Sequence, residues 1–338
     1  MVISNIVTSD ETQVIMSVSY LLGGLRDTIK MRIMLLKPSS SNMSSLHNEI
    51  HSLTDTLEHS RDFLFQRGVL KATMSCAACS ASMTLTSCSS TKSPDLLIWK
   101  CYPCKTYRNI RTDSILSGQK LSLQTFLLLI FYLSVKSLAS VAIHQLIGIS
   151  ENTISEWKVL LHIRVSNWLM ANPSPLGGLG VVVELDEAKF GKRKYNKGSY
   201  REGMWVLGAV DRNTGKCFLL PCPGNRRDAA TLLPLIQRWI LPGSIIHTDE
   251  WAAYNGLASS GYTHNTVNHS LQFVDPATGV HTNTQEGLWA HVKKSVVGST
   301  NLELALINFM FQRRLDSTGG TNQISRCFNG YLTVLKAD

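Results

Sequence analysis

Three carboxylates carry the clearest chemical signal in this sequence. Asp186 ends the β-branched run 181–186, and Asp249 follows the apolar run 244–248. Glu286 lies in the first turn of a helix predicted to open at residue 284. Adjacent strands of one sheet can bring two aspartates together, and a neighbouring helix can add the glutamate. Hard divalent cations prefer such oxygen ligands, and two Mg²⁺ ions roughly 4 Å apart serve phosphodiester chemistry by activating a nucleophile and stabilising a leaving oxygen.

The alternation of side chains along a strand ranks the other acids nearby. Asp249 shares a face with residues 245 and 247, so Glu250 is expected to point the other way. Glu184 shares the face of Asp186, which makes it a rival or supporting group, whereas Glu187 is expected to face away. Glu187 and Glu250 therefore serve as controls for the predicted site.

Two polar residues accompany Glu286 on its helix. Asn283 lies about one turn before Glu286 and could supply a carbonyl oxygen in its place. Lys293 follows Glu286 by seven residues, about two turns, on the same side of the helix. It could hold a DNA phosphate near the metals, or it could be an ordinary exposed lysine.

The chain is basic, with a formal net charge of +9 and a pI near 9.2. This balance favours a polyanionic partner, although charge alone does not separate nucleic acid from an acidic membrane. A run of cations follows Asp186 and is the candidate DNA-contacting segment; it contains Lys189, Lys192, Arg193, Lys194, Lys197 and Arg201. The longest apolar run, 126–133, is far shorter than the roughly 20 residues of a spanning helix, so we expect no membrane partner and no secretory leader.

Two C-x-x-C pairs suggest a second metal. Cys76 and Cys79 form the first pair, and Cys101 and Cys104 form the second, with 21 residues between the pairs. Two such turns can complete a tetrahedral thiolate shell around Zn²⁺, as in a zinc ribbon, and a closed shell of this kind is structural. A redox C-x-x-C or unliganded core cysteines are the alternatives, and Cys88 in the intervening loop could compete as a ligand.

The helical stretch 121–170 contains a possible helix-turn-helix. A helix over 137–146 is followed by a turn at Gly148, and Ser150 is a predicted N-cap for a second helix over 151–170. The polar residues of this second helix that could reach DNA are Ser155, Lys158 and Arg164. His144 stands where a small residue is usual, and an ordinary helical bundle packed on the next domain is the alternative.

The length of 338 residues suggests about two domains with small appendages. Helices are also predicted over 61–70, 228–240, 251–257 and 302–311, and strands over 181–186, 204–210, 217–220 and 244–248. This order predicts an α/β fold with a mixed sheet and flanking helices. The predicted parts are a poorly ordered extension (1–60), a zinc ribbon (61–115), a helix-turn-helix-like region (116–172), the sheet domain (178–318) and a C-terminal tail (319–338).

The order of the motifs adds a family resemblance. Four motifs follow one another along the chain: E-L-D-E-A-K-F-G at 184–191, W-V-L-G-A-V at 205–210, L-P-G-S-I-I-H-T-D at 241–249 and H-T-N-T-Q-E at 281–286. The same part of the chain also contains Trp251, Tyr254, V-N-H-S at 267–270, Trp289 and Lys293. Over about residues 61–315 the chain resembles the D-D-E transposases of the Merlin superfamily, eukaryotic relatives of a group of bacterial insertion-sequence transposases.

The resemblance implies an RNase H-like fold in which Asp186, Asp249 and Glu286 take the places of the catalytic triad. It also implies an N-terminal zinc ribbon and a helical DNA-binding segment. Some bacterial relatives have an asparagine as the third ligand, which keeps Asn283 as a candidate. The N-terminal extension and the altered helix-turn-helix depart from the family.

The implied function is cut-and-paste movement of DNA flanked by inverted repeats, with Mg²⁺, structural Zn²⁺ and no organic cofactor. Double-stranded DNA is the expected partner, a homo-oligomer on DNA the expected assembly, and the nucleus the expected location. Two alternatives remain open. A domesticated transposase could act as a non-catalytic DNA-binding regulator, and an RNase H-like nuclease could cut without strand transfer.

Overall fold

The structure is a computed structural model of the 338-residue chain. It describes residues 6–8, 14–22, 25–33, 48–135, 138–191, 203–267, 279–296, 301–316 and 323–336, with backbone alone before residue 48. The chain divides into two compact units that alternate along the sequence. Unit 1 contains residues 1–66, 74–110 and 119–128, and unit 2 contains residues 67–73, 111–118 and 129–338.

Unit 1 holds two small antiparallel sheets. Strands β1 (Ile6–Thr8), β2 (Val14–Leu22) and β3 (Leu25–Ile33) pair in that order within the segment expected to be a poorly ordered extension. Helix α2 (Leu57–Gln66) follows, beginning four residues earlier than predicted. The cysteine region then forms β4 (Thr84–Ser87), β5 (Leu97–Cys101) and β6 (Thr106–Asn109), paired in the order β4-β5-β6.

Three helices replace the single helical stretch predicted over 121–170. Helix α3 (Leu123–Ser134) runs across the division between the two units, and α4 (Ser140–Ile147) and α5 (Glu151–Ala171) lie in unit 2. The predicted turn between the last two helices is present. Gly148 ends α4 with a left-handed backbone (φ 74°), and the Ser150 side chain accepts a hydrogen bond from the Thr153 amide.

The sheet of unit 2 has five strands in the order β10-β9-β8-β12-β13. These are β8 (Val182–Phe190), β9 (Met204–Asp211), β10 (Cys217–Pro221), β12 (Ile245–Thr248) and β13 (Thr263–Thr266). The first three form an antiparallel meander, and β12 and β13 run parallel to β8. Strand β9 alone runs antiparallel to the other four strands of this sheet. Numbered by their order along the chain, the five strands lie across the sheet in the order 3-2-1-4-5. This arrangement is RNase H-like and confirms the predicted mixed α/β fold.

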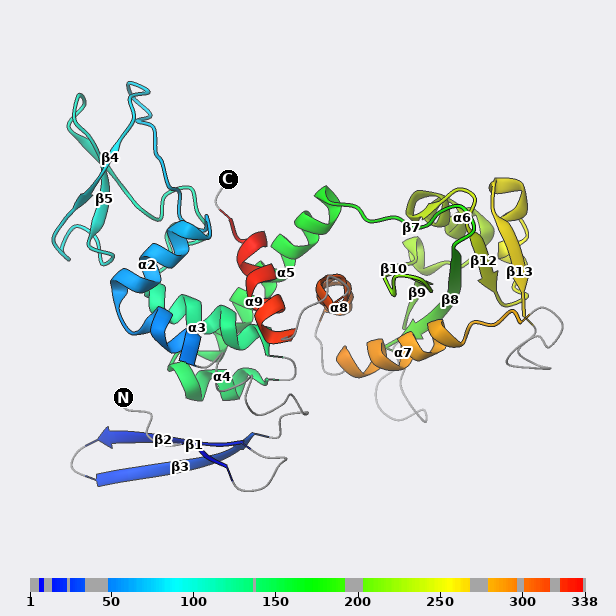
Figure 1. Ribbon diagram of the computed structural model, residues 1–338, viewed down its shortest axis with the longest axis horizontal. Coiled ribbons are helices and arrows are strands. Elements are labelled where there is room, and N and C mark those ends of the chain that lie inside the picture. Colours follow the sequence, from blue (N-terminus) through cyan, green and yellow to red (C-terminus); the bar gives the residue numbers. More distant parts are fainter. Residues whose placement is uncertain are drawn as a thin grey trace. The chain divides into compact units, whose positions relative to one another are not determined.

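Helices cover both faces of this sheet, as Figure 1 shows for α6 (Ala229–Trp239) and α7 (Asn283–Ser295). Leu232 and Ile236 of α6 share one buried apolar cluster with Leu185 and Leu207. A second cluster joins Ala188, Phe190, Val206, Val210 and Leu219 of the sheet to Leu288, Trp289 and Val292 of α7 and Leu306 of α8 (Leu302–Asp316). Alternate residues of β8 and β9 thus face different helices, as the period of a strand requires.

Smaller elements complete unit 2. Strands β7 (Leu176–Gly177) and β11 (Ile240–Leu241) pair in parallel, and η1 (Pro223–Asn225) precedes α6. The predicted helix over 251–257 is wrong, because this stretch contains only the short 3₁₀ helix η2 (Ala252–Tyr254), and a second 3₁₀ helix, η3 (Ala258–Ser260), follows it. Part of the predicted C-terminal tail forms α9 (Gln323–Val334), whose buried residues include Phe328 and Tyr331. No helix in the described part of the chain is both long and apolar enough to cross a membrane.

Strand β8 is longer than the predicted strand over 181–186, which moves Asp186 from the end of a strand to its middle. Pairing with β9 continues as far as Phe190, opposite Met204. Pairing with β12 ends earlier, where His247 lies beside Glu184. Asp186 therefore lies just beyond the last described β8–β12 pair, although its own strand continues.

Gly208 allows α7 to approach the sheet closely. It lies on β9 opposite Asp186, and a Cβ atom there would be 2.3 Å from Gln285 Nε2 and 2.5 Å from the Trp289 ring. Real Cβ contacts of this kind do not occur, so any larger residue would push α7 away. The glycine is a packing requirement, since its backbone does not have a positive φ.

We predict that Gly208→Ala lowers the free energy of unfolding by about 2 kcal/mol, because overpacking a filled interface forces backbone shifts. Gly287→Ala is the matched control, since a Cβ at Gly287 on α7 meets nothing within 4 Å. It should stabilise the protein by up to about 1 kcal/mol through helix propensity. Urea unfolding of the two variants measures both effects, and equal stability would contradict the proposed packing.

Candidate active site and candidate metal centre

The carboxylate of Asp186 is held on the α7 face of the sheet. Trp289 Nε1 donates a hydrogen bond to Asp186 Oδ2 (3.0 Å), and the backbone N–H of Glu187 donates to Asp186 Oδ1 (2.8 Å). The side chain is half-buried. Each of the two carboxylate oxygens accepts one of these hydrogen bonds. The indole of α7 therefore links the orientation of this acid to the position of the helix.

Asp249 follows the last residue of β12 and is also half-buried. Parallel pairing places His247 beside Glu184, and two further steps in the same register lead to Asp249 and Asp186. The backbone N–H of Trp251 donates to Asp249 Oδ1 (3.0 Å), which turns the chain away from the sheet. Each aspartate is therefore two residues beyond the last described β8–β12 pair.

Glu187 lies on the opposite face of β8 but is electrically close to both aspartates. Burial raises the pKa of Glu187 to about 7, a hydrogen bond from Tyr254 Oη (2.8 Å) opposes this rise, and the charges of Asp186 and Asp249 add to it. Alternation correctly predicts the face of Glu187. Glu187 is nevertheless not the inert control it was expected to be, because charges interact strongly through a poorly solvated interior.

Glu184 is fully buried and anchors α7. Its carboxylate forms an ion pair with Arg212 through Oε1 and accepts the backbone N–H of Gln285 on Oε2 (2.9 Å). Arg212 Nη2 also donates to the backbone carbonyl of His281 (2.8 Å). Of the two roles left open for Glu184, these contacts favour the supporting one, because both of its oxygens are already engaged. The sequence shows no signal for the partnership with Arg212 and Gln285.

Glu286, Asn283 and Lys293 are exposed on α7. Glu286 lies in the first turn of the helix, next to the buried Gln285 and three residues before Trp289. Its backbone is therefore placed by the same contacts that hold Asp186. Among the described residues, the three predicted acids do not form a closely gathered ligand set. Their oxygen donors suit a hard divalent cation in kind.

Most of the predicted basic segment lies outside the described residues. This applies to Lys192, Arg193, Lys194, Lys197 and Arg201. Lys189 is described, on β8, with its Nζ 5.4 Å from the ring centre of Trp205. The DNA-contacting role of the run stays a prediction.

The four cysteines of the C-x-x-C pairs form a candidate metal centre in unit 1. Their sulfur atoms all lie within 4.8 Å of one another, and Sγ of Cys79 and Sγ of Cys101 are 3.6 Å apart. Backbone hydrogen bonds from Ala78 and Cys79 lower the pKa of Cys76 to about 6, which favours its thiolate. Cys88 is not part of the group. The spacing argument therefore selects the four ligands that the fold brings together.

The two cysteine turns are each followed by a residue with the same backbone conformation. Ser80, directly after the first pair, and Lys105, directly after the second, have left-handed backbones with φ of 59° and 54°. The Ser80 amide also returns to the carbonyl of Cys76 (2.8 Å). Such turns direct two sulfur atoms to one side, and a tetrahedral thiolate site requires this geometry.

The second helix of the helix-turn-helix-like region has two kinds of contact. Ile154 and Trp157 of this helix are buried. Lys158 donates from Nζ to Ser140 Oγ on α4 (2.8 Å), so it joins the two helices, whereas Ser155 is exposed. Further along, Trp168 contacts Phe311 of α8 edge to face (5.6 Å between ring centres). Helix α5 therefore combines a helix-turn-helix-like start with packing against α8.

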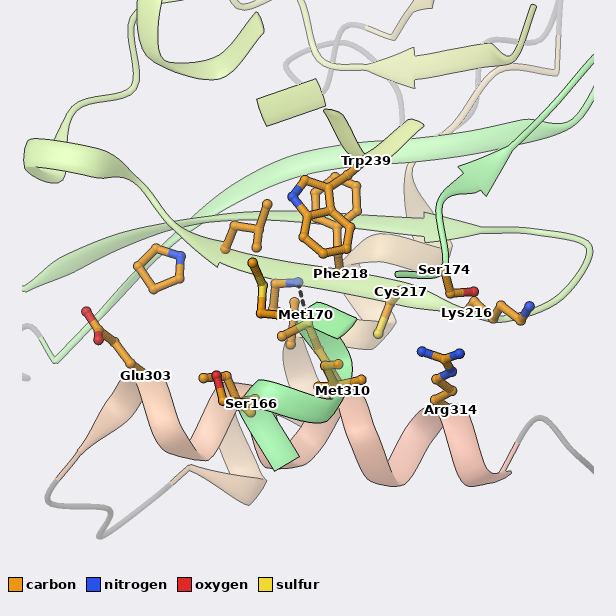
Figure 2. A pocket seen from close by; sticks show the side chains of 15 residues that line it. Ser166, Met170, Ser174, Lys216, Cys217, Phe218, Trp239, Glu303, Met310 and Arg314 are labelled. Carbon is orange, nitrogen blue, oxygen red and sulfur yellow. Dashed lines mark hydrogen bonds between the residues drawn. The ribbon is translucent and has the colours of Figure 1, made fainter. Parts of the chain in front are cut away.

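A cavity of about 220 Å³ lies apart from the predicted acids (Figure 2). Residues of α5, β10 and α8 line it, with Trp239 of α6 and Phe218 of β10 on its apolar wall and Lys216, Glu303 and Arg314 as its charged residues. None of the predicted site residues lines this cavity. It is therefore a separate feature of the fold.

The strand order of the five-stranded sheet defines an RNase H-like domain, with Asp186 on β8 and Asp249 directly after β12. Residues 175–301 match the family model of the ISXO2-like transposase domain. This part of the chain is therefore similar to insertion-sequence transposase domains, in agreement with the resemblance noted in the sequence.

Two further comparisons accompany this match. An uncharacterized transposase-like protein of Haemophilus influenzae is 35% identical over 79 residues, which is 23% of this chain and 63% of the relative's length. Solved structures of the HTLV-2 integrase catalytic core domain in complex with magnesium, in trimeric and dimeric form, are 16% and 14% identical. Each alignment covers 40% of this chain and 86% of the integrase chain, with a TM-score of 0.28.

We predict that Glu184→Gln lowers the free energy of unfolding by about 3 kcal/mol, because it leaves Arg212 and the start of α7 without their buried carboxylate. Glu156→Gln on the exposed side of α5 is the control and should change it by less than about 0.5 kcal/mol. Urea unfolding followed by circular dichroism makes the comparison. Similar small losses for both variants would show that Glu184 does not anchor the helix.

Proposed function

We propose that this protein is a D-D-E transposase of the Merlin kind, or a protein derived from one, that cuts DNA at the ends of a mobile element and joins them to a target. The placement of the two aspartates carries the proposal. Asp186 lies on β8 and Asp249 directly follows the neighbouring parallel strand β12, each two residues beyond the last described pair, Glu184 with His247, and Trp289 of α7 hydrogen-bonds to Asp186. The transposase-domain match over residues 175–301 supports the same reaction class.

The residues that would hold catalytic Mg²⁺ are Asp186, Asp249 and Glu286, with Asn283 as the alternative third ligand. When bound, two such ions would supply a polarised water or 3′-hydroxyl nucleophile and neutralise charge on the leaving oxygen. The protein's own contribution is positional. Trp289 fixes the carboxylate of Asp186, and the buried Glu184 fixes the first turn of the helix that carries Glu286. Lys293 is exposed on the same helix and would contact a DNA phosphate.

We further propose that the four-cysteine centre holds one structural Zn²⁺. Four thiolates in two turns match the donor set and number that this ion takes in structural sites. The ribbon has a small apolar core in which Ile98 and Trp99 are buried, so a metal would add folding free energy where packing is limited.

The proposed partner is double-stranded DNA, at both the element ends and the target, bound by a homo-oligomer in the nucleus. The net charge of +9 supports a polyanionic partner. The zinc ribbon and the helix-turn-helix-like start of α5 would recognise the ends, with Ser155 exposed there.

The second candidate function is that of a domesticated, non-catalytic DNA-binding regulator. The exposed position of Glu286, apart from the two aspartates among the described residues, is the observation in its favour. An active enzyme would have to gather the third acid when metal and DNA bind. A nuclease without strand transfer would share the site, and a joining assay separates it from a transposase.

For the metal centre, we predict that Cys101→Ser lowers the zinc content from one ion per chain towards zero and unfolds the ribbon. Unit 2 should keep its own transition on heating, because it contains two apolar clusters of its own. Cys88→Ser is the matched control, since this cysteine lies in the same loop but outside the cluster. Elemental analysis and thermal unfolding measure the result, and a folded wild-type protein without zinc would refute the assignment.

For catalysis, we predict that Asp186→Asn, Asp249→Asn and Glu286→Gln each reduce DNA cleavage by roughly a thousandfold or more. Folding and DNA binding should stay nearly unchanged, because each substitution preserves size. The assay is Mg²⁺-dependent nicking and joining of plasmid DNA that carries the inverted repeats flanking the coding region.

Two further variants make this assay decisive. Glu250→Gln is the control and should retain cleavage, because Glu250 is exposed beside Asp249. Asn283→Ala should be milder than Glu286→Gln if the glutamate is the third ligand. If Glu286→Gln cuts as well as wild type, the third acid is misassigned. If wild type binds the ends but never cuts, the regulator is the correct function.

A further inference from the structure

An arginine lies between two tryptophans on the α6 side of the sheet. The guanidinium of Arg227 is 4.4 Å from the ring centre of Trp205 and 4.3 Å from that of Trp251. Both distances are within the range of cation–π contacts. We call Trp205, Arg227 and Trp251 the arginine–tryptophan cluster.

The backbone around Arg227 is held firmly in place. Two residues earlier, Asn225 accepts the amide of Trp205 on Oδ1 (2.7 Å) and donates to the carbonyl of Gly203 (3.0 Å). One residue later, Asp228 caps α6 by accepting the Thr231 amide. Indole Nε1 of Trp251 donates to the carbonyl of Arg227 itself (3.2 Å). The cluster is therefore pre-organised rather than a chance surface contact.

The cluster adjoins the predicted acids. Trp251 follows Asp249 by two residues, and its amide is a hydrogen-bond donor to that carboxylate. The positive charge of Arg227 lowers the pKa of Glu187, the residue next to Asp186. Lys189 contributes a further cation beside Trp205. A DNA strand that brings a phosphate to Asp249 would have a short path to this cluster, because Trp251 is hydrogen-bonded to that residue.

The chemistry of the cluster suits a nucleotide. The Arg227 guanidinium lies over the rings of both Trp205 and Trp251. In the described part of the chain, its N–H groups have no hydrogen-bond acceptor, and an arginine edge is a bidentate phosphate donor. Trp251 is 40% exposed, which is unusual for so large an apolar ring. Aromatic rings of this kind stack on nucleobases.

We propose that the arginine–tryptophan cluster is a binding site for one unpaired nucleotide of the DNA strand next to the cleavage point. The edge of Arg227 holds the phosphate, and the exposed indole of Trp251 stacks on the base. Trp205 supports the guanidinium from the other side. The inference rests on the proposed function, because it takes DNA as the molecule that reaches the acids.

The test measures binding without cleavage, using the full-length protein with Ca²⁺ in place of Mg²⁺. The probes are a fluorescein-labelled 15-nucleotide oligothymidylate and an abasic strand of the same length, which has the same phosphates and no bases. Wild type should bind the thymidylate more tightly, by roughly tenfold, because each stacked base adds affinity. Fluorescence anisotropy at several salt concentrations gives the dissociation constants.

Trp251→Ala should abolish this preference for bases, and Trp251→Phe should retain most of it, since the phenyl ring still stacks. Trp251→Leu serves if the alanine variant does not fold, because leucine keeps apolar bulk without an aromatic face. Arg227→Gln should weaken binding to both probes and reduce the salt slope by about one. Arg238→Gln is the matched control, since Arg238 also lies over a tryptophan (Trp239, 5.9 Å) but is exposed on α6.

The proposal is overturned if the folded Trp251→Ala and Trp251→Leu variants keep the wild-type preference for bases. It is also overturned if Arg227→Gln lowers thermal stability and leaves both dissociation constants and the salt slope unchanged, which would make the cluster a purely structural contact. Wild type that prefers bases but never cuts DNA would refute the transposase and leave this site standing. If wild type cuts normally and the variants keep their preference for bases, the nucleotide site is refuted and the transposase function stands.

Discussion

The buried carboxylate of Glu184 is the contact on which the proposed active site depends. It joins β8, Arg212 at the end of β9 and the amide of Gln285 at the start of α7. Burying a charge without partners is strongly unfavourable, so the carboxylate and its donors constrain one another. Because Asp186 lies two residues along the same strand and Glu286 follows Gln285, this one ion pair sets the frame for two of the three acids.

The approach of α7 to the sheet has a matching steric requirement. Gly208 leaves room for Gln285 and Trp289, and the indole then reaches Asp186. A polar contact thus forms inside an apolar interface, where a hydrogen bond is strong and an unpaired polar group is strongly destabilising. The opposite face of β8 carries Glu187, whose pKa is raised mainly by burial and further by the charges of Asp186 and Asp249.

The cysteine centre depends on the geometry of two turns and on the pairing of three strands. Each C-x-x-C turn is followed by a residue with a left-handed backbone, so local geometry alone pairs the sulfur atoms within a turn. Pairing of β5 with β4 and β6 then brings the two turns together. This part of the chain is a small body with few buried apolar side chains, in contrast to unit 2, which builds two apolar clusters around its sheet.

The sequence by itself determined the features whose signals are local. Strand and helix periods predicted the mixed sheet and most of its helices, the cysteine spacing predicted the four-sulfur cluster, and Gly148 with Ser150 predicted the turn before α5. Only the tertiary structure showed that Glu184 is an anchor and that Arg227 lies between Trp205 and Trp251. These roles arise from residues far apart in the chain that meet through strand register and helix packing, and no local pattern encodes such meetings.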